Sequence, residues 1–436
     1  MQKQACQCAP LSPMPRSRCS IGPSRWALLL LLGSAVAKPL TREERLPTVE
    51  QRVKLYMSNW YEASCRPLSY TYQNSDDGWS TLMLQDLENM TLAVESIIEP
   101  DKMFFVDERT LNNCVNGPSD DKLFTGRVQF RENMLMYCSD AADSMVTAVD
   151  HTEVRAPILM QFGDLKHSHV YRDVNVPHFK KFRSAAVSPE ALEQASCANP
   201  LATVHSTTKL QPIVWKLATS RHFRLANQVY RDDVPWENKV DMAVFRGQLT
   251  GSPEGYDKSK SDRENCWNMR RCRLVVSHAN STLVHAKLTS TRGRIADTLD
   301  GVELVGPKVT MRKLLQFKGI IMLEGNDVAS GLKWALLSQS VVLMPPPRHT
   351  SWLMEELLVP WVHYIPLKED LTDVEEKMQW VVDHDEEARK IADQGSLWMD
   401  DLCFHPDAKE DDRLIQEEMV RRYQAHFVDA PTMLAA

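Results

Sequence analysis

Four short apolar runs, interrupted by a polar residue only at Gln161, constrain the fold of this chain more than any other feature. They are residues 158–162, 242–245, 320–323 and 341–344, and each ends at a turn with glycine, aspartate, arginine or proline. Runs of this kind are typical of strands buried on both faces of a parallel sheet, especially where helical stretches follow them. The pattern predicts an α/β fold. Because ligands bind beyond the carboxyl ends of such strands, we expect function in the turns.

The length of the chain, 436 residues, exceeds what one hydrophobic core usually organises, so we expect two domains and a cleft between them. Pro235 and Trp236 form the best candidate linker. Residues 45–155 are rich in acidic and helix-favouring residues, and we interpret them as mainly helical. Near the end, Ile415, Met419, Tyr423 and Phe427 recur at helical spacing, which predicts a helix over residues 411–427.

The overall charge gives no reason to expect nucleic acid as a partner. The formal net charge is -7, whereas proteins that bind nucleic acids usually present a basic face. With 43% hydrophobic and 25% charged residues, the composition is that of an ordinary globular protein.

The first residues have the pattern of a signal peptide, which we place at residues 1–37. Three arginines precede an apolar run over residues 26–32, and the small residues Ala35 and Ala37 follow it. The run is short for a membrane span, but an uncleaved anchor remains the alternative, and only then would a membrane be a partner. We therefore expect the protein in the lumen of the secretory pathway, in the endoplasmic reticulum or Golgi, or outside the cell.

The expected compartment is oxidising, which favours disulfides for the cysteines beyond the signal. Of the ten cysteines, those beyond it are Cys65, Cys114, Cys138, Cys197, Cys266, Cys272 and Cys403. The close spacing of Cys266 and Cys272 would also suit a metal, but no second close Cys or His pair accompanies them, so we favour disulfides and expect no metal site. Asn89 and Asn280 stand in glycosylation sequons.

The first candidate site is the sequence LEGNDVASGLK at residues 323–333. Gly325 lets the backbone approach a ligand, and a helix starting near Asp327 would attract an anion at its N-terminus. Glu324 can accept hydrogen bonds from ribose hydroxyls. The alternative is an ordinary strand–helix turn in which Asp327 caps the helix and Lys333 is solvated.

The second candidate site is the sequence FRGQLTG at residues 245–251, another strand end with two glycines. Arg270, Arg271 and Arg273 follow it. Guanidinium groups match phosphate oxygens bidentately, so arginines near a glycine turn can hold a diphosphate. Arginines on a helix face are often merely solvated, and this alternative stays open for Arg271 and Arg273.

Asp164 provides the third candidate site, because it follows the run at residues 158–162. A carboxylate at a strand end that faces a cleft can act as a general base. Aspartate is also a common turn former, which is the alternative.

These motifs occur in a characteristic order: FRGQLTG, then EGNDVASGLKW, then SQSVVLMPPP, and finally PWVHYIPLKEDLTDVEE. In this order they resemble glycosyltransferase family 90, best over residues 235–401. The family includes Rumi-like protein O-glucosyltransferases, fungal capsule xylosyltransferases and bacterial lipopolysaccharide core transferases. The motifs resemble more than one of these branches, so the branch stays open.

The resemblance implies a GT-B architecture of two Rossmann-like domains and an inverting, metal-independent transfer from a UDP-sugar, without a further cofactor. It implies an acceptor-side domain at 45–235, a nucleotide-sugar-binding domain at 236–400 and a helical segment at 401–428 that returns to the first domain. It also implies that Asp164 is the catalytic base and that Cys65 pairs with Cys403. The expected donor-binding residues are Arg246, Gly247, Gln248, Arg270, Glu324, Gly325, Asn326, Ser330 and Lys333.

We therefore expect a glycosyltransferase that moves glucose or xylose to a hydroxyl of a protein or glycan. The alternative is a catalytically inactive, lectin-like or chaperone-like protein of the same fold. Two features motivate this alternative: Lys333 stands where many members have arginine, and about a dozen extra residues precede Arg270.

Overall fold

The computed structural model describes ten segments of the chain: residues 40–61, 69–74, 80–85, 91–94, 103–106, 158–161, 179–185, 212–216, 225–251 and 256–427. Asp164, Cys65, Asn89 and the predicted signal peptide lie outside these segments, so what the sequence predicts for them stays a prediction.

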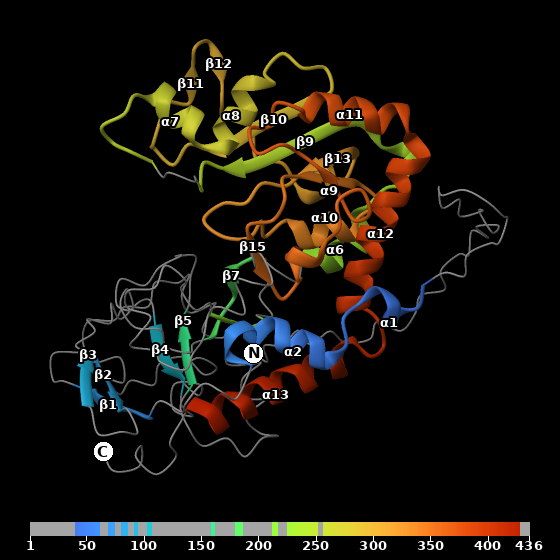
Figure 1. Ribbon diagram of the computed structural model, residues 1–436. Coiled ribbons are helices and arrows are strands. Elements are labelled where there is room, and N and C mark those ends of the chain that lie inside the picture. Colours follow the sequence, from blue (N-terminus) through green and yellow to red (C-terminus); the bar gives the residue numbers. More distant parts are fainter. Residues whose placement is uncertain are drawn as a thin grey trace, which may run out of the picture.

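A five-stranded, wholly parallel sheet forms the centre of the C-terminal half (Figure 1). Its strands, in spatial order, are β10 (Val284–Ser290), β9 (Val240–Gln248), β13 (Phe317–Ile321), β14 (Val341–Met344) and β16 (Ile365–Pro366). Three of the predicted apolar runs become β9, β13 and β14. The predicted α/β class is therefore confirmed for this half of the chain.

Helices cover both faces of this sheet. Alternate residues of its strands point to opposite sides, and the residues on each side pack against a different set of helices. Ala243, Leu343 and Ile321 pack in one hydrophobic cluster with α8 (Arg270–Ser277) and α11 (Val374–Asp383). Val244 and Val342 pack in the other cluster. The helices of that second cluster include α6 (Leu225–Asp232), α10 (Leu332–Leu337) and α12 (Asp385–Cys403). The fully apolar runs thus reflect burial from both sides.

Shorter elements complete this half of the chain. They are α7 (Asp262–Asn268), β11 (Thr298–Leu299), β12 (Val302–Glu303), α9 (Met311–Leu314) and the 3-10 helices η5 (Trp236–Asn238) and η6 (Glu355–Leu357).

The N-terminal half contains two further sheets. The strands of the first, in spatial order, are β4 (Met103–Val106), β5 (Ile158–Gln161), β6 (Phe179–Lys180) and β8 (Ile213–Val214), of which β5, β6 and β8 are parallel. The second is an antiparallel meander of β1 (Ser69–Asn74), β2 (Ser80–Gln85) and β3 (Thr91–Val94). The mainly helical interpretation of residues 45–155 is therefore wrong at β1 to β4. Strands such as Ser69–Asn74 carry the Tyr and Thr residues that favour extended backbone.

A short two-stranded sheet joins the two halves. Strand β7 (Phe182–Ser184) pairs antiparallel with β15 (His349–Ser351), which follows β14 closely in sequence (Figure 1). Next to this pairing, Arg183 forms an ion pair with Glu356 at 2.6 Å, and both side chains are buried. The edge of the central sheet and the N-terminal half are thus held together at one place.

The two ends of the described chain also pack on each other. Helix α1 (Arg42–Arg45) precedes helix α2 (Val49–Met57), and the 3-10 helix η1 (Ser58–Trp60) follows α2 directly. Helix α2 lies along α13 (Ala408–Phe427) (Figure 1). Burial alone would raise the pKa of Asp411, but hydrogen bonds from Arg42 and Arg52 hold that pKa below its ordinary value. The predicted C-terminal helix is confirmed.

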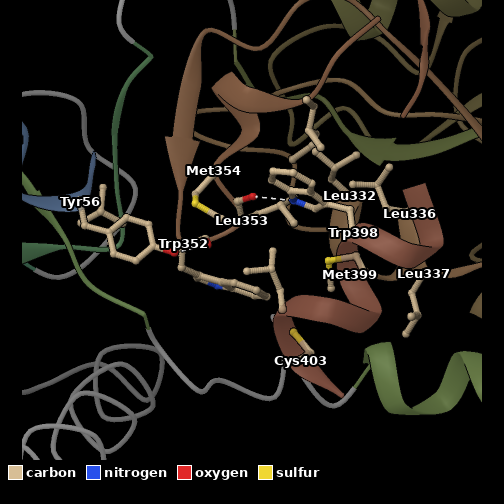
Figure 2. Packing of buried hydrophobic residues seen from close by; sticks show 14 of the residues in the cluster. Tyr56, Leu332, Leu336, Leu337, Trp352, Leu353, Met354, Trp398, Met399 and Cys403 are labelled. Carbon is tan, nitrogen blue, oxygen red and sulfur yellow. Dashed lines mark hydrogen bonds between the residues drawn. The ribbon is translucent and has the colours of Figure 1, made fainter. Parts of the chain in front are cut away.

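A hydrophobic cluster joins buried residues of α2, α10 and α12 (Figure 2). Tyr56 of α2 donates a hydrogen bond to the carbonyl of Trp352 at 2.7 Å, and the Trp398 indole donates to the carbonyl of Leu353 at 3.0 Å. Cys403 is buried in the same cluster. Its predicted partner, Cys65, lies outside the described residues, so this disulfide stays a prediction.

A disulfide between Cys266 and Cys272 closes the corner between α7 and α8, which confirms that these cysteines form a disulfide. Both cysteines are fully buried. Replacing both by alanine is expected to lower the free energy of unfolding by about 2 kcal/mol, the chain-entropy value for so short a loop. Urea unfolding measures this change, and a non-reducing peptide map identifies the bond. A double variant as stable as the wild type would contradict the expected contribution.

Among the described residues, no helix has both the length and the hydrophobicity that crossing a membrane requires. Asn280, in the second sequon, is exposed in the turn after α8.

Candidate functional site

The candidate site lies at the carboxyl edge of the central parallel sheet, where the strand order reverses. In chain order the five strands are β9, β10, β13, β14 and β16, whereas β9 lies between β10 and β13 in space. The connections after β9 and β13 therefore leave the sheet in opposite directions, and ligands bind at this point of the sheet in folds of this type. The sequences FRGQLTG and LEGND both end at this point.

The loops after β9 and β13 touch backbone to backbone. Gly251 has φ of 69°, and a Cβ atom placed on it would stand 2.1 Å from the carbonyl oxygen of Gly325. The Gly251 N–H donates a hydrogen bond to the side-chain oxygen of Asn326 at 3.3 Å. Glycine is needed at 251 because of both its backbone angle and this close approach. The two motifs therefore form one structural unit.

Arg271 bridges the same two loops. Its Nη1 donates hydrogen bonds to the carbonyl of Gln248 at 2.9 Å and to the Thr250 hydroxyl at 2.8 Å. Its Nη2 donates to the carbonyl of Leu323 at 2.7 Å. Burial lowers the pKa of Arg271 to about 10, with Asp327 acting in the opposite direction, so the guanidinium is charged at neutral pH. The solvated alternative for Arg271 is therefore wrong.

Arg270, the neighbouring residue, lines a hollow at the ends of β13 and β14 together with Glu324 and Glu355. The remaining lining residues are Met322, Val328, Ala329, Leu332, Met344, Pro345, Pro346 and Pro347. The Arg270 side chain is only 8% exposed and forms an ion pair with Glu369. Burial, with Arg348 and Arg273 nearby, lowers the pKa of Arg270 to about 10. The hollow, about 20 Å³ in volume, has room for a water molecule. A buried cation and a carboxylate that line it can contact the charge and the hydroxyl groups of a ligand that lies over it.

Glu324 fastens the start of β15 to the end of β13. One carboxylate oxygen accepts hydrogen bonds from the backbone N–H groups of Arg348 and His349, both at 2.9 Å, and the other lies 3.0 Å from Nδ1 of His349. Burial opposes ionisation, but the hydrogen bonds from His349 and Arg348 outweigh it and lower the pKa of Glu324. Glu324 is therefore an anion that also positions the wall of the hollow.

Lys333 is buried against Glu355, which lines the hollow. Its ammonium group lies 2.8 Å from Glu355 and donates to the Ser351 hydroxyl at 2.9 Å, with both charged side chains 2% exposed. The solvated alternative for Lys333 is therefore wrong. A donor contact by Lys333 stays a prediction, and the charge of Lys333 is already balanced by a residue that lines the hollow.

Asp327 does not cap a helix, contrary to the first interpretation of LEGNDVASGLK. Helix α10 begins at Leu332 with Gly331 as its N-cap, so ten residues separate β13 from α10. The Asp327 carboxylate instead forms an ion pair at 2.6 Å with Lys181, which lies between β6 and β7. A partner from the N-terminal half has replaced the local cap.

The other predicted donor residues are spread along the same edge. Arg246 lies on β9 and donates to the carbonyl of His285 on β10 at 3.0 Å. Gln248, at the end of β9, and Ser330, before α10, are exposed, while Gly247 is half-buried. The structure thus brings Arg270 and Glu324 together in one hollow and joins Gly325 and Asn326 to Gly251. Arg246 faces the neighbouring strand.

Sequence reasoning missed Glu355, His349 and the bridging role of Arg271. Glu355 accepts hydrogen bonds from the backbone and hydroxyl of Ser351, four residues earlier. The short spacing from Ser351 to Glu355 is the signal that could have found this pair. No comparable signal distinguishes Arg271 from Arg270, because only the path of the chain between α7 and α8 decides which arginine faces which loop.

Comparison with known proteins supports a common family for this region. The model of glycosyl transferase family 90 matches residues 219–404. An O-glucosyltransferase LpsA from Dichelobacter nodosus is 41% identical over 189 residues, which are 43% of this chain and 50% of that protein. Protein O-glucosyltransferase 1 of Rattus norvegicus is 30% identical over 209 residues, 44% of this chain and 48% of that protein.

Protein O-glucosyltransferase 2 of Danio rerio is 34% identical over 164 residues, covering 36% of this chain and 28% of that protein. The matches thus span half or less of the length of these relatives. The family model covers the chain from α6 to α12, where the loops after β9 and β13, the hollow and the arginines lie. Residues 219–404 therefore form a glycosyltransferase family 90 domain.

Proposed function

We propose that this protein transfers a sugar, glucose or xylose, from a UDP-sugar to a hydroxyl group of a protein or glycan in the secretory pathway. In this proposal the chain has a GT-B arrangement, with an acceptor-side domain over residues 45–235 and a donor-binding domain over residues 236–400. The Cys266–Cys272 disulfide supports an oxidising compartment. The O-glucosyltransferase names of the relatives favour glucose.

The observation that carries the proposal is that Arg270 and Glu324 line the same small hollow at the carboxyl edge of a parallel sheet. A nucleoside diphosphate carries negative charge at one end and ribose hydroxyls at the other. A guanidinium fork complements the diphosphate, and a carboxylate accepts hydrogen bonds from hydroxyl groups. Both groups line one hollow here, at the edge of the sheet where nucleotides bind in related folds.

The proposed reaction is a single displacement. Asp164 removes the proton from the acceptor hydroxyl while the acceptor oxygen forms a bond to the anomeric carbon of the sugar. The bond from that carbon to the diphosphate oxygen breaks on the opposite face, and UDP departs with the bonding electrons. The configuration at the anomeric carbon is therefore inverted. Arg270 stabilises the charge that develops on UDP, and no metal ion takes part.

The test is a panel of UDP-sugars with the purified protein, first for thermal stabilisation and then for transfer to protein and glycan acceptors. The correct donor is expected to raise the unfolding temperature, because a ligand that binds only the folded state stabilises it. An Asp164→Asn variant is expected to bind that donor and to transfer about 100-fold more slowly, since general-base catalysis contributes at least this much.

Two outcomes would overturn parts of this proposal. An Asp164→Asn variant with full transfer rate would remove Asp164 from the reaction. Donor binding without transfer or hydrolysis, for every acceptor tried, would favour the inactive, lectin-like alternative.

A further inference from the structure

We propose that Arg271 is a positioning residue of the donor site, which fixes the loops after β9 and β13 and, through α8, the place of Arg270. The inference rests on the proposed function only where it concerns UDP. The bridge itself is a feature of the structure.

The two arginines lie in sequence on one helix and face different parts of the site. Successive residues of an α-helix point about 100° apart, so Arg270 and Arg271 cannot share one direction. Arg270 faces the hollow that Glu324 lines. Arg271 faces the loops after β9 and β13, where it reaches the carbonyls of Gln248 and Leu323.

The glycines of both motifs leave room for the Arg271 guanidinium. A Cβ atom on Gly325 would stand 3.0 Å from Nη2, and one on Gly247 would stand 3.4 Å from Nη1. The planar fork therefore fits between two backbones that lack side chains. Lysine offers a single nitrogen, which cannot reproduce the fork geometry that spans both loops.

The helix that carries Arg271 is itself held in place. Cys272, the next residue, is bonded to Cys266, and Met269 at the corner is fully buried. The two hydrogen-bonding nitrogens of Arg271 are occupied by protein acceptors. Its Nε is buried without a hydrogen-bond partner among the described residues. Because both terminal nitrogens hold the loops, we assign Arg271 an action on a donor through the loops and through Arg270.

Arg271→Lys tests the inference, with Arg263→Gln as its control. Arg263 lies on α7, is 66% exposed and forms a surface ion pair with Asp300. In calorimetric titrations with UDP, the lysine variant is expected to bind about tenfold more weakly at a stoichiometry near one, which corresponds to about 1.4 kcal/mol. Arg263→Gln is expected to bind like the wild type.

A purely structural role would produce a different result. If Arg271 only helped folding, the lysine variant would show fewer binding-competent molecules with unchanged affinity, and the inference would fail. A conservative pair adds a second readout: Thr250→Ser keeps the hydroxyl that Arg271 uses, and Thr250→Val removes it. The valine variant is expected to bind UDP more weakly than the serine variant, and equal affinities would contradict the inference.

Hydrogen exchange separates this inference from the proposed function. In Arg271→Lys, the amides of residues 248–251 and 323–326 are expected to exchange faster, whereas in Arg263→Gln they exchange as in the wild type. Unchanged exchange in the lysine variant would show that the loops hold without the bridge. Failure of the wild type to bind UDP would count against the proposed donor, while the exchange measurement would still decide whether Arg271 positions the loops.

Discussion

Replacing Gly251 by alanine is expected to abolish UDP binding and to destabilise the protein strongly. The added Cβ atom would lie 2.1 Å from the carbonyl oxygen of Gly325 and 2.6 Å from its Cα, so the overlap is with backbone that cannot rotate away. The loop after β9 must move, which breaks its hydrogen bond with Asn326 and its contacts with Arg271. Urea unfolding and titration with UDP measure the two effects.

Gly301 provides a matched control for this variant. It also has a positive φ, of 80°, but a Cβ atom there would meet no atom within 4 Å. Gly301→Ala is expected to cost only the left-handed backbone penalty, about 1–2 kcal/mol, and to leave UDP binding intact. Equal losses in the two variants would show that backbone angle alone, and not contact between the loops, makes Gly251 necessary.

Breaking the Lys333–Glu355 ion pair is expected to produce the largest loss of stability among single side-chain changes at the site. Lys333→Met leaves a buried carboxylate without its cation, for which about 3–5 kcal/mol is typical. Glu355→Gln leaves a buried ammonium group in the same position. The double variant is expected to lose less than the sum of the two, because neither charge is then left alone.

A double-mutant cycle in urea measures this coupling, with Lys313→Met as the control. Lys313 is exposed on α9 and donates a hydrogen bond to Gln316 alone, so its loss is expected to be close to neutral. Additive effects of Lys333→Met and Glu355→Gln would show that the two groups do not stabilise each other.

The strands that form the site could be predicted from sequence because their signal is local. Residues 242–245 and 341–344 are apolar without interruption, and this pattern has few explanations other than a strand buried on both faces. The glycine turns that follow could be predicted for the same reason. Gly325 and Asn326 lie in the loop after β13, and their contact with Gly251 depends on how β9 and β13 pair, which the sequence does not indicate.

Other features depend on partners that are distant in sequence. Asp327 was expected to cap a helix, but its carboxylate bonds to Lys181, which local spacing cannot indicate. Lys333 is predicted to contact a donor or solvent. Its ion pair with Glu355 cannot be predicted from local spacing, because η6, which contains Glu355, meets α10, which contains Lys333, only in the folded chain. Ser69–Asn74 is a strand within a stretch whose overall composition favours helices.

The packing of α2 on α13 determines when the protein can finish folding. Arg42 and Arg52 bond to Asp411, which lies 369 and 359 residues further along the chain. During synthesis, α2 therefore emerges long before its partner exists, and its apolar face has nothing native to cover it. Contacts this distant in sequence also form slowly. Helix α2 is thus among the last of the described helices to reach its native environment.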